Sequence, residues 1–512
     1  MNTKLLKQKI LDLAIRGKLT QQLKSDGTAA DLLTQISDER RKTRDERKGT
    51  RSKKSGVLDL SADRIQEKTS LRAKRGNPSP QTIIPLDKNE APFEIPANWE
   101  WVRLGDVCEL LNGDRSSNYP NKNEYVVCGV AWINTGHIRP DGFLDEKTMN
   151  YITEEKYNSL GNGKIHKFDL VYCLRGATFG KVARVEPFEK GAIASSLMII
   201  RPILSQMRDF LYRCLKTDFA MNQLRKFDNG SAQPNLAAKD VSRYFVPLPP
   251  LAEQQRIVAK IEEAFAEIDA IEKNKELLKT HIKQTRQKIL DLAIHGKLVP
   301  QNKSDEPASV LLERITRDNP HYEKLTDIPF EIPESWEWVN AEDLFNIRSA
   351  IRIHQTDWQK EGIPFFRGRE LVQLCKTGNV DFEIYISEKL YEENKRKGGV
   401  PQKNDILVSA VGTLGFAYVV KGNKPFYYKD AYILCFENRH NLNPFYFQHL
   451  IHSKFINKII YGGSKGTTVD QLTIENAKKL PMPLPPLAEQ KRIVNKIEEI
   501  FASLDAISRH LD

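Results

Sequence analysis

The sequence lacks the features that mark membrane, secreted and disulfide-bonded proteins. No apolar run approaches the length of a membrane span, and the N-terminal residues contain no signal-peptide core. The six cysteines include no Cys-x-x-Cys pair, which is typical of reduced thiols in a cytoplasmic protein. We therefore expect a cytoplasmic protein without a membrane partner.

The sequence also lacks the motifs of common catalytic sites. It has no P-loop, no glycine-rich cofactor loop after a strand, and no cluster with metal-ligand spacing. The Asn-Pro-Phe-Tyr segment at 443–446 resembles the loop with which adenine methyltransferases hold a flipped base, but the second proline is absent. A helix start, with Asn443 as the cap, is the better interpretation. We expect no catalytic residue and no metal ligand, and a DNA adenine methyltransferase is the enzymatic alternative.

The sequence does contain an internal duplication. Three blocks recur in the same order with few differences, which chance does not produce. One unit of about half the chain is therefore repeated. The matching blocks are Gln8–Leu19 and Gln287–Leu298, Phe93–Val102 and Phe330–Val339, and Pro247–Val258 and Pro483–Val494.

The spacing of the repeats predicts how the two copies are connected. The last block recurs at an offset of 236 (from 247 to 483) and the first at an offset of 279 (from 8 to 287). Asp512 therefore corresponds to position 276 of the first copy and Met1 to position 280. One helical connector is intact in the middle of the chain, and the other is divided between its ends. We expect the terminal helices to meet, which closes the copies into a pseudo-two-fold ring.

Residues 251 to about 296 are expected to form one long helix that spans roughly 65 Å. Apolar residues recur there at three-, four- and seven-residue steps, as in a coiled-coil seam. The expected antiparallel partner is the matching helix assembled from 487–512 and 3–16. Gly17 and Gly296 stand where a C-terminal helix cap belongs. The expected seam consists of Ile257, Ile261, Phe265, Ile268, Ile271, Leu278, Ile282, Ile289 and Leu292.

The fold class is expected to be α+β, with two mostly-β modules joined by the long helices. Runs rich in β-branched residues indicate strands at 125–128, 169–173, 192–195, 405–409 and 427–434, and helices are expected over 207–226 and 445–460. The expected divisions are an N-terminal helix 1–20, a basic insertion 21–91, a first module 92–246, a central helix 247–298, a linker 299–328, a second module 329–482 and a C-terminal helix 483–512.

The net charge of +11 favours an acidic partner, with nucleic acid as the first candidate. Residues 38–76 carry several Arg and Lys runs and have no equivalent in the second copy. A solvated surface excursion is one interpretation of this segment. A phosphate-binding arm is the other.

The duplicated Pro-Leu-Pro-Pro-Leu-Ala-Glu-Gln and Gln-Lys-Ile-Leu-Asp-Leu-Ala-Ile blocks and the Trp-Glu-Trp-Val segments resemble the specificity subunits of type I restriction–modification enzymes. The resemblance covers nearly the whole chain. It implies that each module is a target-recognition domain for one half of a split DNA site. It also implies that the helices set the spacing and bind two methyltransferase subunits, which restriction subunits join.

The residues support this interpretation independently. Two half-sites are read by two modules at a set distance, near one DNA turn of roughly 34 Å or its multiples. The copies match in the helices and diverge inside the modules, so we expect two different half-sites. A coiled-coil scaffold without DNA function is a second alternative. The basic charge and the divergent modules favour DNA binding.

Three regions of the modules hold candidate DNA contacts. Glycine-bearing hairpins at 169–184 and 405–415 either present side chains to DNA or form only tight turns. Polar loops at 230–236 and 466–472 either bind phosphate and adenine edges or cap helices. Loops near 133–139 and 366–371 carry arginines suited to guanine, although solvation accounts for most surface arginines. The candidates are Arg139, Arg175, Thr178, Lys181, Ser231, Gln233, Asn235, Arg367, Arg369, Thr413, Lys465, Thr467 and Thr468.

The tryptophans at 99, 101, 336 and 338 are expected to pack in the core rather than to stack on bases, because they lie in repeated apolar segments. No cofactor is expected in this chain. The resemblance implies that partner subunits bind S-adenosylmethionine, ATP and magnesium. The expected partners are double-stranded DNA, two methyltransferase subunits and restriction (translocase) subunits.

The ring predicts that a circular permutant remains functional. If the natural ends are joined and new ends are opened within 299–306, few contacts are broken, because this segment is polar and follows the Gly296 cap. Co-expression with the methyltransferase partner, followed by mapping of DNA methylation, should show the natural target sequence. A permutant that folds but gives no methylation would contradict the ring.

Overall fold

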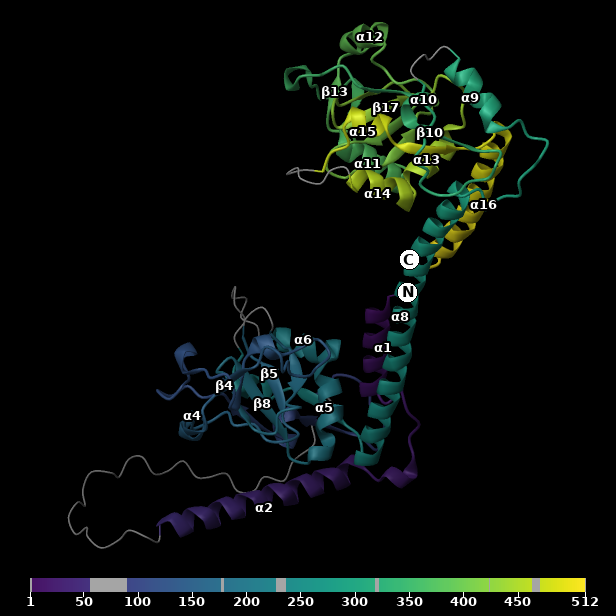
Figure 1. Cartoon of the computed structure of the whole chain (residues 1–512). Helices are drawn as coiled ribbons and strands as arrows, with labels where there is room; N and C mark the ends of the chain where they lie inside the picture. Colours follow the sequence, from purple (N-terminus) through teal and green to yellow (C-terminus); the bar gives the residue numbers. More distant parts are fainter. Residues whose placement is uncertain are drawn as a thin grey trace. The chain divides into compact units, whose positions relative to one another are not determined.

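One helix, α8 (Leu251–Ile294), runs through the middle of the chain (Figure 1). The computed structural model describes residues 2–55, 90–175, 179–226, 236–317, 322–422, 424–462 and 470–511. The chain divides within α8 into unit 1, Met1–Lys273, and unit 2, Asn274–Asp512. Each unit therefore contains one module with a helical segment before it and another after it.

The module of unit 1 combines three small sheets with short helices. Their strand orders are β2-β8-β5-β6, β4-β3-β7 and β1-β9, and β3 pairs with β7 in parallel. The strands are β1 (Glu100–Arg103), β2 (Cys108–Asn112), β3 (Val130–Ile133), β4 (Asn150–Ile152), β5 (Leu170–Cys173), β6 (Val182–Arg184), β7 (Gly191–Ile193), β8 (Leu197–Pro202) and β9 (Phe245–Leu248). The helices before α8 are α1 (Thr3–Ile15), α2 (Ala29–Ser55), α3 (Leu104–Val107), α4 (Glu154–Ser159), α5 (Arg208–Leu215), α6 (Asp218–Lys226) and α7 (Ala238–Val241).

Unit 2 repeats this topology. Its sheets have the orders β11-β17-β14-β15, β13-β12-β16 and β10-β18, and β12 pairs with β16 in parallel. The strands are β10 (Glu337–Asn340), β11 (Asn346–Ser349), β12 (Ile363–Phe366), β13 (Tyr385–Ile386), β14 (Ile406–Ser409), β15 (Ala417–Val419), β16 (Tyr427–Tyr428), β17 (Ile433–Glu437) and β18 (Pro481–Leu484). The helices after α8 are α9 (Ala308–Thr316), α10 (Ala341–Leu344), α11 (Gly368–Thr377), α12 (Glu388–Arg396), α13 (Pro444–Ile451), α14 (Lys454–Gly462), α15 (Ile474–Lys478) and α16 (Leu487–Arg509). The predicted α+β class and the duplication are confirmed.

Within each unit the module is attached to its helices by the same buried contact. In unit 1 the indole Nε1 of Trp99 donates to the Glu253 carboxylate at 2.9 Å, and in unit 2 Trp336 donates to Glu489 at 3.0 Å. Both carboxylates lie in the first turn of the helix that leaves the module and are no more than 1% exposed. All four repeated tryptophans are buried, so their predicted core role is confirmed.

The helix pairs also repeat. In unit 1 Lys7 of α1 pairs with Asp269 in the first half of α8, and in unit 2 Arg286 in the second half of α8 pairs with Asp505 of α16. Figure 1 shows α1 and α16 each running along α8. The predicted partner of the long helix is thus made of two pieces, one in each unit. Closure of the ring depends on how the two units are placed, and it stays a prediction.

Most of the predicted seam is buried, but its centre is not. Ile257, Ile261, Ile268 and Ile282 are buried, and Phe265, Ile289 and Leu292 are partly buried. Placing Ile271 and Leu278 in the seam was wrong, because they are 49% and 39% exposed. The partner helices end near this part of α8, because the hydroxyl of Thr3, the first residue of α1, donates to Glu272, and α16 ends at Arg509. The prediction missed the buried Leu290, Ala293 and Ile294.

Four local predictions need correction. The strand expected at 427–434 divides into β16, which ends at Tyr428, and β17, which begins at Ile433 in another sheet. Residues 207–226 and 445–460 each form two helices, because Thr217 and Ser453 interrupt them. The hydroxyls of these residues accept from the backbone N–H groups of Ala220 and Ile456, which starts a new helix. The segment 125–128 is not a strand. It forms only an isolated bridge at Val126, and Val127 is 97% exposed.

The basic insertion begins inside a repeated helix. Ala29, Leu32 and Leu33 at the start of α2 are buried, as are the matching residues at the start of α9. The last described helical residue of α9 is Thr316, whereas α2 continues to Ser55. The insertion therefore extends an element that both units need for packing, and Arg40 fastens it by donating to the Gly105 carbonyl at 2.6 Å.

The buried seam gives a direct test of the helix pairing. Ile261→Asp and Ile268→Asp each bury a carboxylate without a partner and should destabilise unit 1 by several kcal/mol. Ile271→Asp is the matched control, since the same substitution three residues further along the helix stays in water. Thermal unfolding followed by circular dichroism should show loss of stability for the first two variants only. Equal melting temperatures for all three variants would contradict the burial of Ile261 and Ile268 in the helix pair.

Candidate nucleic-acid interface

The predicted hairpins are present in both units. β5 pairs with β6 and β14 with β15, each in antiparallel register. Gly180, Gly412 and Gly415 have φ near +80°, so the prediction that the glycines serve the turns is confirmed for these three. Matching backbone positions carry different side chains. The Lys181 carbonyl accepts from Cys173 as the Phe416 carbonyl accepts from Ser409.

The candidate side chains on these hairpins differ in exposure. Lys181 and Thr413 are exposed, whereas Arg175 is half-buried. The Nε of Arg175 is fully buried and has no partner among the described residues. Thr178 lies outside the described residues. The hairpin of unit 1 therefore offers basic groups where unit 2 has Val411 and Phe416.

The structure brings the hairpins next to the second candidate region in each unit. Leu236 donates to the Leu174 carbonyl at 3.1 Å, and Leu472 donates to the Ala410 carbonyl at 2.8 Å. The exit loops thus return to the ends of β5 and β14. The candidates on these loops lie outside the described residues, and their contacts stay predictions. They are Ser231, Gln233, Asn235, Lys465, Thr467 and Thr468.

The third region follows the central strands β3 and β12. Arg139 is exposed and forms an ion pair with Asp141. Arg367 and Arg369 were expected on a loop, but Arg367 caps α11 and Arg369 lies in its first turn. The signal for a helix start was Glu370 at three residues from the cap, a capping-box spacing. The backbone N–H of Arg367 donates to the Glu370 carboxylate at 3.0 Å.

These two arginines have different surroundings. The Arg367 side chain is 21% exposed and bound to Glu370, which is 3% exposed, so Arg367 neutralises a buried charge. Arg369 is 57% exposed and lies between Glu370 and the exposed Glu383. Arg369 is therefore the more accessible of the two arginines, and it gives Glu370 one hydrogen bond, at 2.6 Å, where the Arg367 side chain gives three.

The carboxylates around Arg369 are held in the charged form. Burial alone would raise the pKa of Glu370, but hydrogen bonds from Arg367 and Arg369 outweigh it and lower that pKa. A hydrogen bond from Arg369 likewise lowers the pKa of Glu383. An arginine pre-oriented by two carboxylates keeps its guanidinium in one direction, which suits bidentate recognition.

The methyltransferase-like segment is a helix start. Asn443 caps α13 with its side-chain oxygen accepting from Phe445 at 3.1 Å. Tyr446 is 1% exposed and donates to the Pro483 carbonyl at 2.9 Å, so it faces the core. Among the described residues, no His, Cys, Asp and Glu group has metal-site geometry, and no helix is long and apolar enough to cross a membrane.

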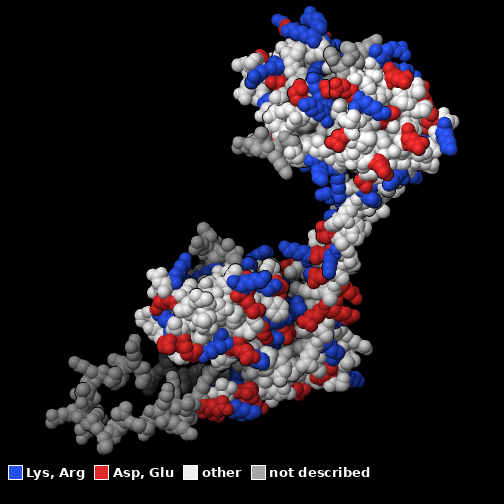
Figure 2. All heavy atoms as spheres, viewed as in Figure 1, with Lys and Arg blue, Asp and Glu red and all other residues white. Residues whose placement is uncertain are grey.

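Surface charge is mixed on both units. Figure 2 shows Lys and Arg interspersed with Asp and Glu over the visible face of each. Residues 38–76 contain 14 Lys and Arg and 7 Asp and Glu, which amounts to +7 of the net +11. The basic balance of the sequence therefore resides mainly in the insertion rather than in the modules.

Known proteins are similar to this chain in both of its halves. The family model for the type I restriction modification DNA specificity domain matches residues 96–280 and again 333–511. The chain is 24% identical to the type I restriction enzyme EcoAI specificity subunit of Escherichia coli, over 98% of this chain and 90% of that one. It is also 24% identical to the EcoEI specificity subunit of the same organism, over 99% and 90%. A solved HsdS subunit from Thermoanaerobacter tengcongensis shares the fold with a TM-score of 0.53 at 20% identity, covering 82% of this chain and 94% of that one.

Arg367 and Arg369 are separable by mutation. Arg369→Ala should cost less stability than Arg367→Ala, because Arg369 donates one hydrogen bond to Glu370 and the Arg367 side chain donates three. It should weaken recognition of one half-site only, measured with probes mutated in one half at a time. Arg367→Ala should cost about 2 kcal/mol or more at neutral pH, because it removes three side-chain hydrogen bonds from the buried Glu370 carboxylate. A carboxyl whose pKa is lowered by folding stabilises the fold at pH values above its unfolded pKa, and this stability is lost as pH falls through its folded pKa. The difference in unfolding free energy between wild type and Arg367→Ala should therefore become smaller as pH falls through the folded pKa of Glu370. Loss at both half-sites for Arg369→Ala would contradict its assignment to one module.

Proposed function

The chain belongs to the family of type I restriction–modification DNA specificity proteins, and on that premise we propose that it reads a two-part DNA site, one part with each unit. It is the DNA-recognition subunit of such a system and not its catalytic subunit. The two parts of the site are different sequences, so the whole site is asymmetric. The helices keep the two modules at a set spacing.

The observation that carries this proposal is a common scaffold with different side chains at matching positions. Both units share sheet order, the Trp–Glu contact and the helix ion pair. At the hairpin, Arg175 and Lys181 of unit 1 stand where unit 2 has Val411 and Phe416. The bases are read by the side chains that reach the groove of DNA. Two modules with the same backbone topology and different side chains at matching positions therefore favour two different half-sites.

Methyltransferase subunits are proposed to dock on the helices. Ile271 in unit 1 and Ile507 in unit 2 are equivalent residues at the repeat offset and are 49% and 45% exposed. Each unit thus presents the same apolar position to solvent, which suits two copies of one partner. S-adenosylmethionine, ATP and magnesium are proposed to be bound by the methyltransferase and restriction subunits, which carry out the chemistry.

DNA binding tests the proposal directly. Methylation mapping in cells with and without this gene identifies the split site. The purified chain should then bind a duplex with that site more tightly than an unrelated duplex, and binding should weaken as salt rises. Probes mutated in one half at a time should each lose affinity. The chain alone should transfer no methyl group from S-adenosylmethionine. Equal affinity for all duplexes would contradict sequence recognition, and methylation by the chain alone would favour an enzyme.

A further inference from the structure

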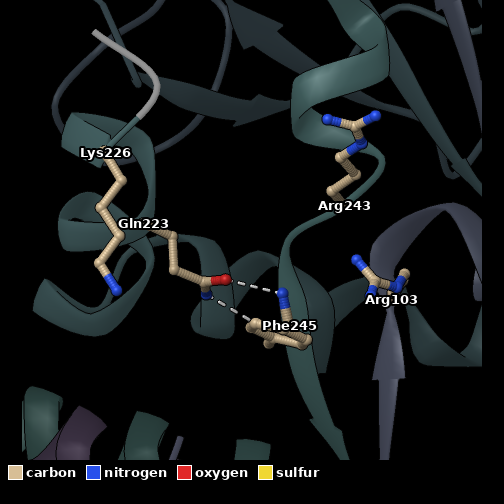
Figure 3. Close-up of a pocket in the computed structure, with 5 residues that line it drawn as sticks. All are labelled: Arg103, Gln223, Lys226, Arg243 and Phe245. Atoms are coloured by element: carbon tan, nitrogen blue, oxygen red, sulfur yellow. Dashed lines mark hydrogen bonds between the residues drawn. The ribbon is translucent and has the colours of Figure 1, made fainter. Parts of the chain in front are cut away.

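A hollow with a basic lining opens on unit 1 at the edge of the β1–β9 pair. It has a volume of about 670 Å³ and is lined by Arg103, Gln223, Lys226, Arg243 and Phe245 (Figure 3). Arg103 and Phe245 are paired residues of β1 and β9, Lys226 ends α6, and Arg243 follows α7. Four elements of one unit therefore bring three cations to one hollow.

The floor of this hollow is held in place by hydrogen bonds. The Gln223 side chain donates to the Phe245 carbonyl at 3.1 Å and accepts from the Phe245 N–H at 2.7 Å (Figure 3). Gln223 is 8% exposed, and the Arg103 guanidinium lies over the Phe245 ring at 5.4 Å. The amide thus ties α6, which ends at Lys226, to β9, and the Phe245 ring lies under Arg103 of β1.

The cations have little anionic compensation. Among the residues that the structure describes, no carboxylate lines the hollow. The Arg103 guanidinium forms an ion pair with Glu90 at 3.8 Å, which is itself well exposed, and the Arg103 backbone N–H donates to the Asp106 carboxylate. Lys226 and Arg243 are exposed and form no ion pair with any described residue. Three positive charges with one exposed ion-pair partner among the described residues create a local positive potential that favours an anion.

The same position in unit 2 lacks this character. The residues that match Arg103, Gln223, Lys226, Arg243 and Phe245 are Asn340, Ile459, Gly462, Lys479 and Pro481. Unit 2 keeps one of the three cations, as Lys479, and has Ile459 and Pro481 in place of the Gln223 amide and the Phe245 ring. The shared frame does not require the basic hollow, so packing does not account for its presence in unit 1.

We propose that this hollow binds a phosphate group. A guanidinium fork offers two parallel N–H donors to phosphate oxygens, and a lysine adds a point charge. The group is either a phosphodiester of bound DNA or a free phosphate, which have the same recognition chemistry. In the DNA case, which rests on the proposed function, the contact positions unit 1 on the duplex without reading its sequence.

The test uses the full-length chain and the double variant Lys226→Ala/Arg243→Ala. Both side chains are exposed, so the variant should fold, and unchanged thermal unfolding checks this. Lys479→Ala is the matched control, because it removes the one counterpart cation of unit 2. One arm measures affinity for the target duplex and for an unrelated duplex at several salt concentrations. The other arm measures binding of inorganic phosphate by calorimetry at low salt.

A DNA phosphate predicts that the double variant loses about tenfold in affinity for both duplexes alike. The slope of log affinity against log salt should fall by about 1 to 2, and Lys479→Ala should change neither. A free phosphate predicts that wild type binds inorganic phosphate, that the double variant does not, and that DNA affinity is unchanged. A folded double variant that matches wild type in both arms overturns the proposal. If wild type does not prefer the target duplex, the proposed sequence recognition is wrong. The calorimetric measurement with inorganic phosphate then still shows whether the hollow binds phosphate.

Discussion

The structure depends on a carboxylate buried where each module joins its helices. Glu253 accepts from the Trp99 indole and from the Thr20 hydroxyl, at 2.9 and 3.3 Å. A buried charge is costly unless its oxygens are satisfied, so this carboxylate fixes three segments that are far apart in the chain. In unit 2, Glu489 does the same with Trp336 and Gln301, and its burial raises its pKa while both hydrogen bonds oppose the rise. Substitution of either partner leaves the buried carboxylate with one side-chain hydrogen bond fewer.

This junction explains why the copies agree at their entrances and differ inside. Three segments of each unit meet at one carboxylate: the segment before β1 or β10, the segment after the glycine cap of α1 or α8, and the first turn of α8 or α16. Their sequences are therefore constrained together. Gly17 illustrates the tightness, because an added Cβ would lie 2.3 Å from Pro96, and Gly296 meets Pro333 at the same distance. The hairpins and the hollow lie outside this set of contacts. Their side chains are free to differ, which is what two readers of different DNA sequences require.

Charge on this protein is organised locally rather than as one basic surface. Arg367 is committed to a buried acid, Arg369 is oriented by two acids, and Arg175 is half-buried. The hollow beside Arg103 is the contrasting case, because two of its three cations, Lys226 and Arg243, form no ion pair with a described residue. A single Arg or Lys in the sequence therefore says little about DNA contact until its ionic neighbours are known.

The sequence by itself determined the duplication, the α+β class, the long helix and the family, because repeated blocks and apolar periodicity are properties of order along the chain. It also identified the tryptophans as core and Asn443 as a helix cap. It did not distinguish Arg367 from Arg369, or find that Ile271 leaves the seam, because both depend on which side chains come within a few ångströms in space. The helix breaks at Thr217 and Ser453 were missed, because a hydroxyl chooses between capping and solvent only in its packed surroundings. Tertiary structure alone assembled the basic hollow from four elements of unit 1, since no spacing along the sequence relates Arg103 to Lys226 and Arg243.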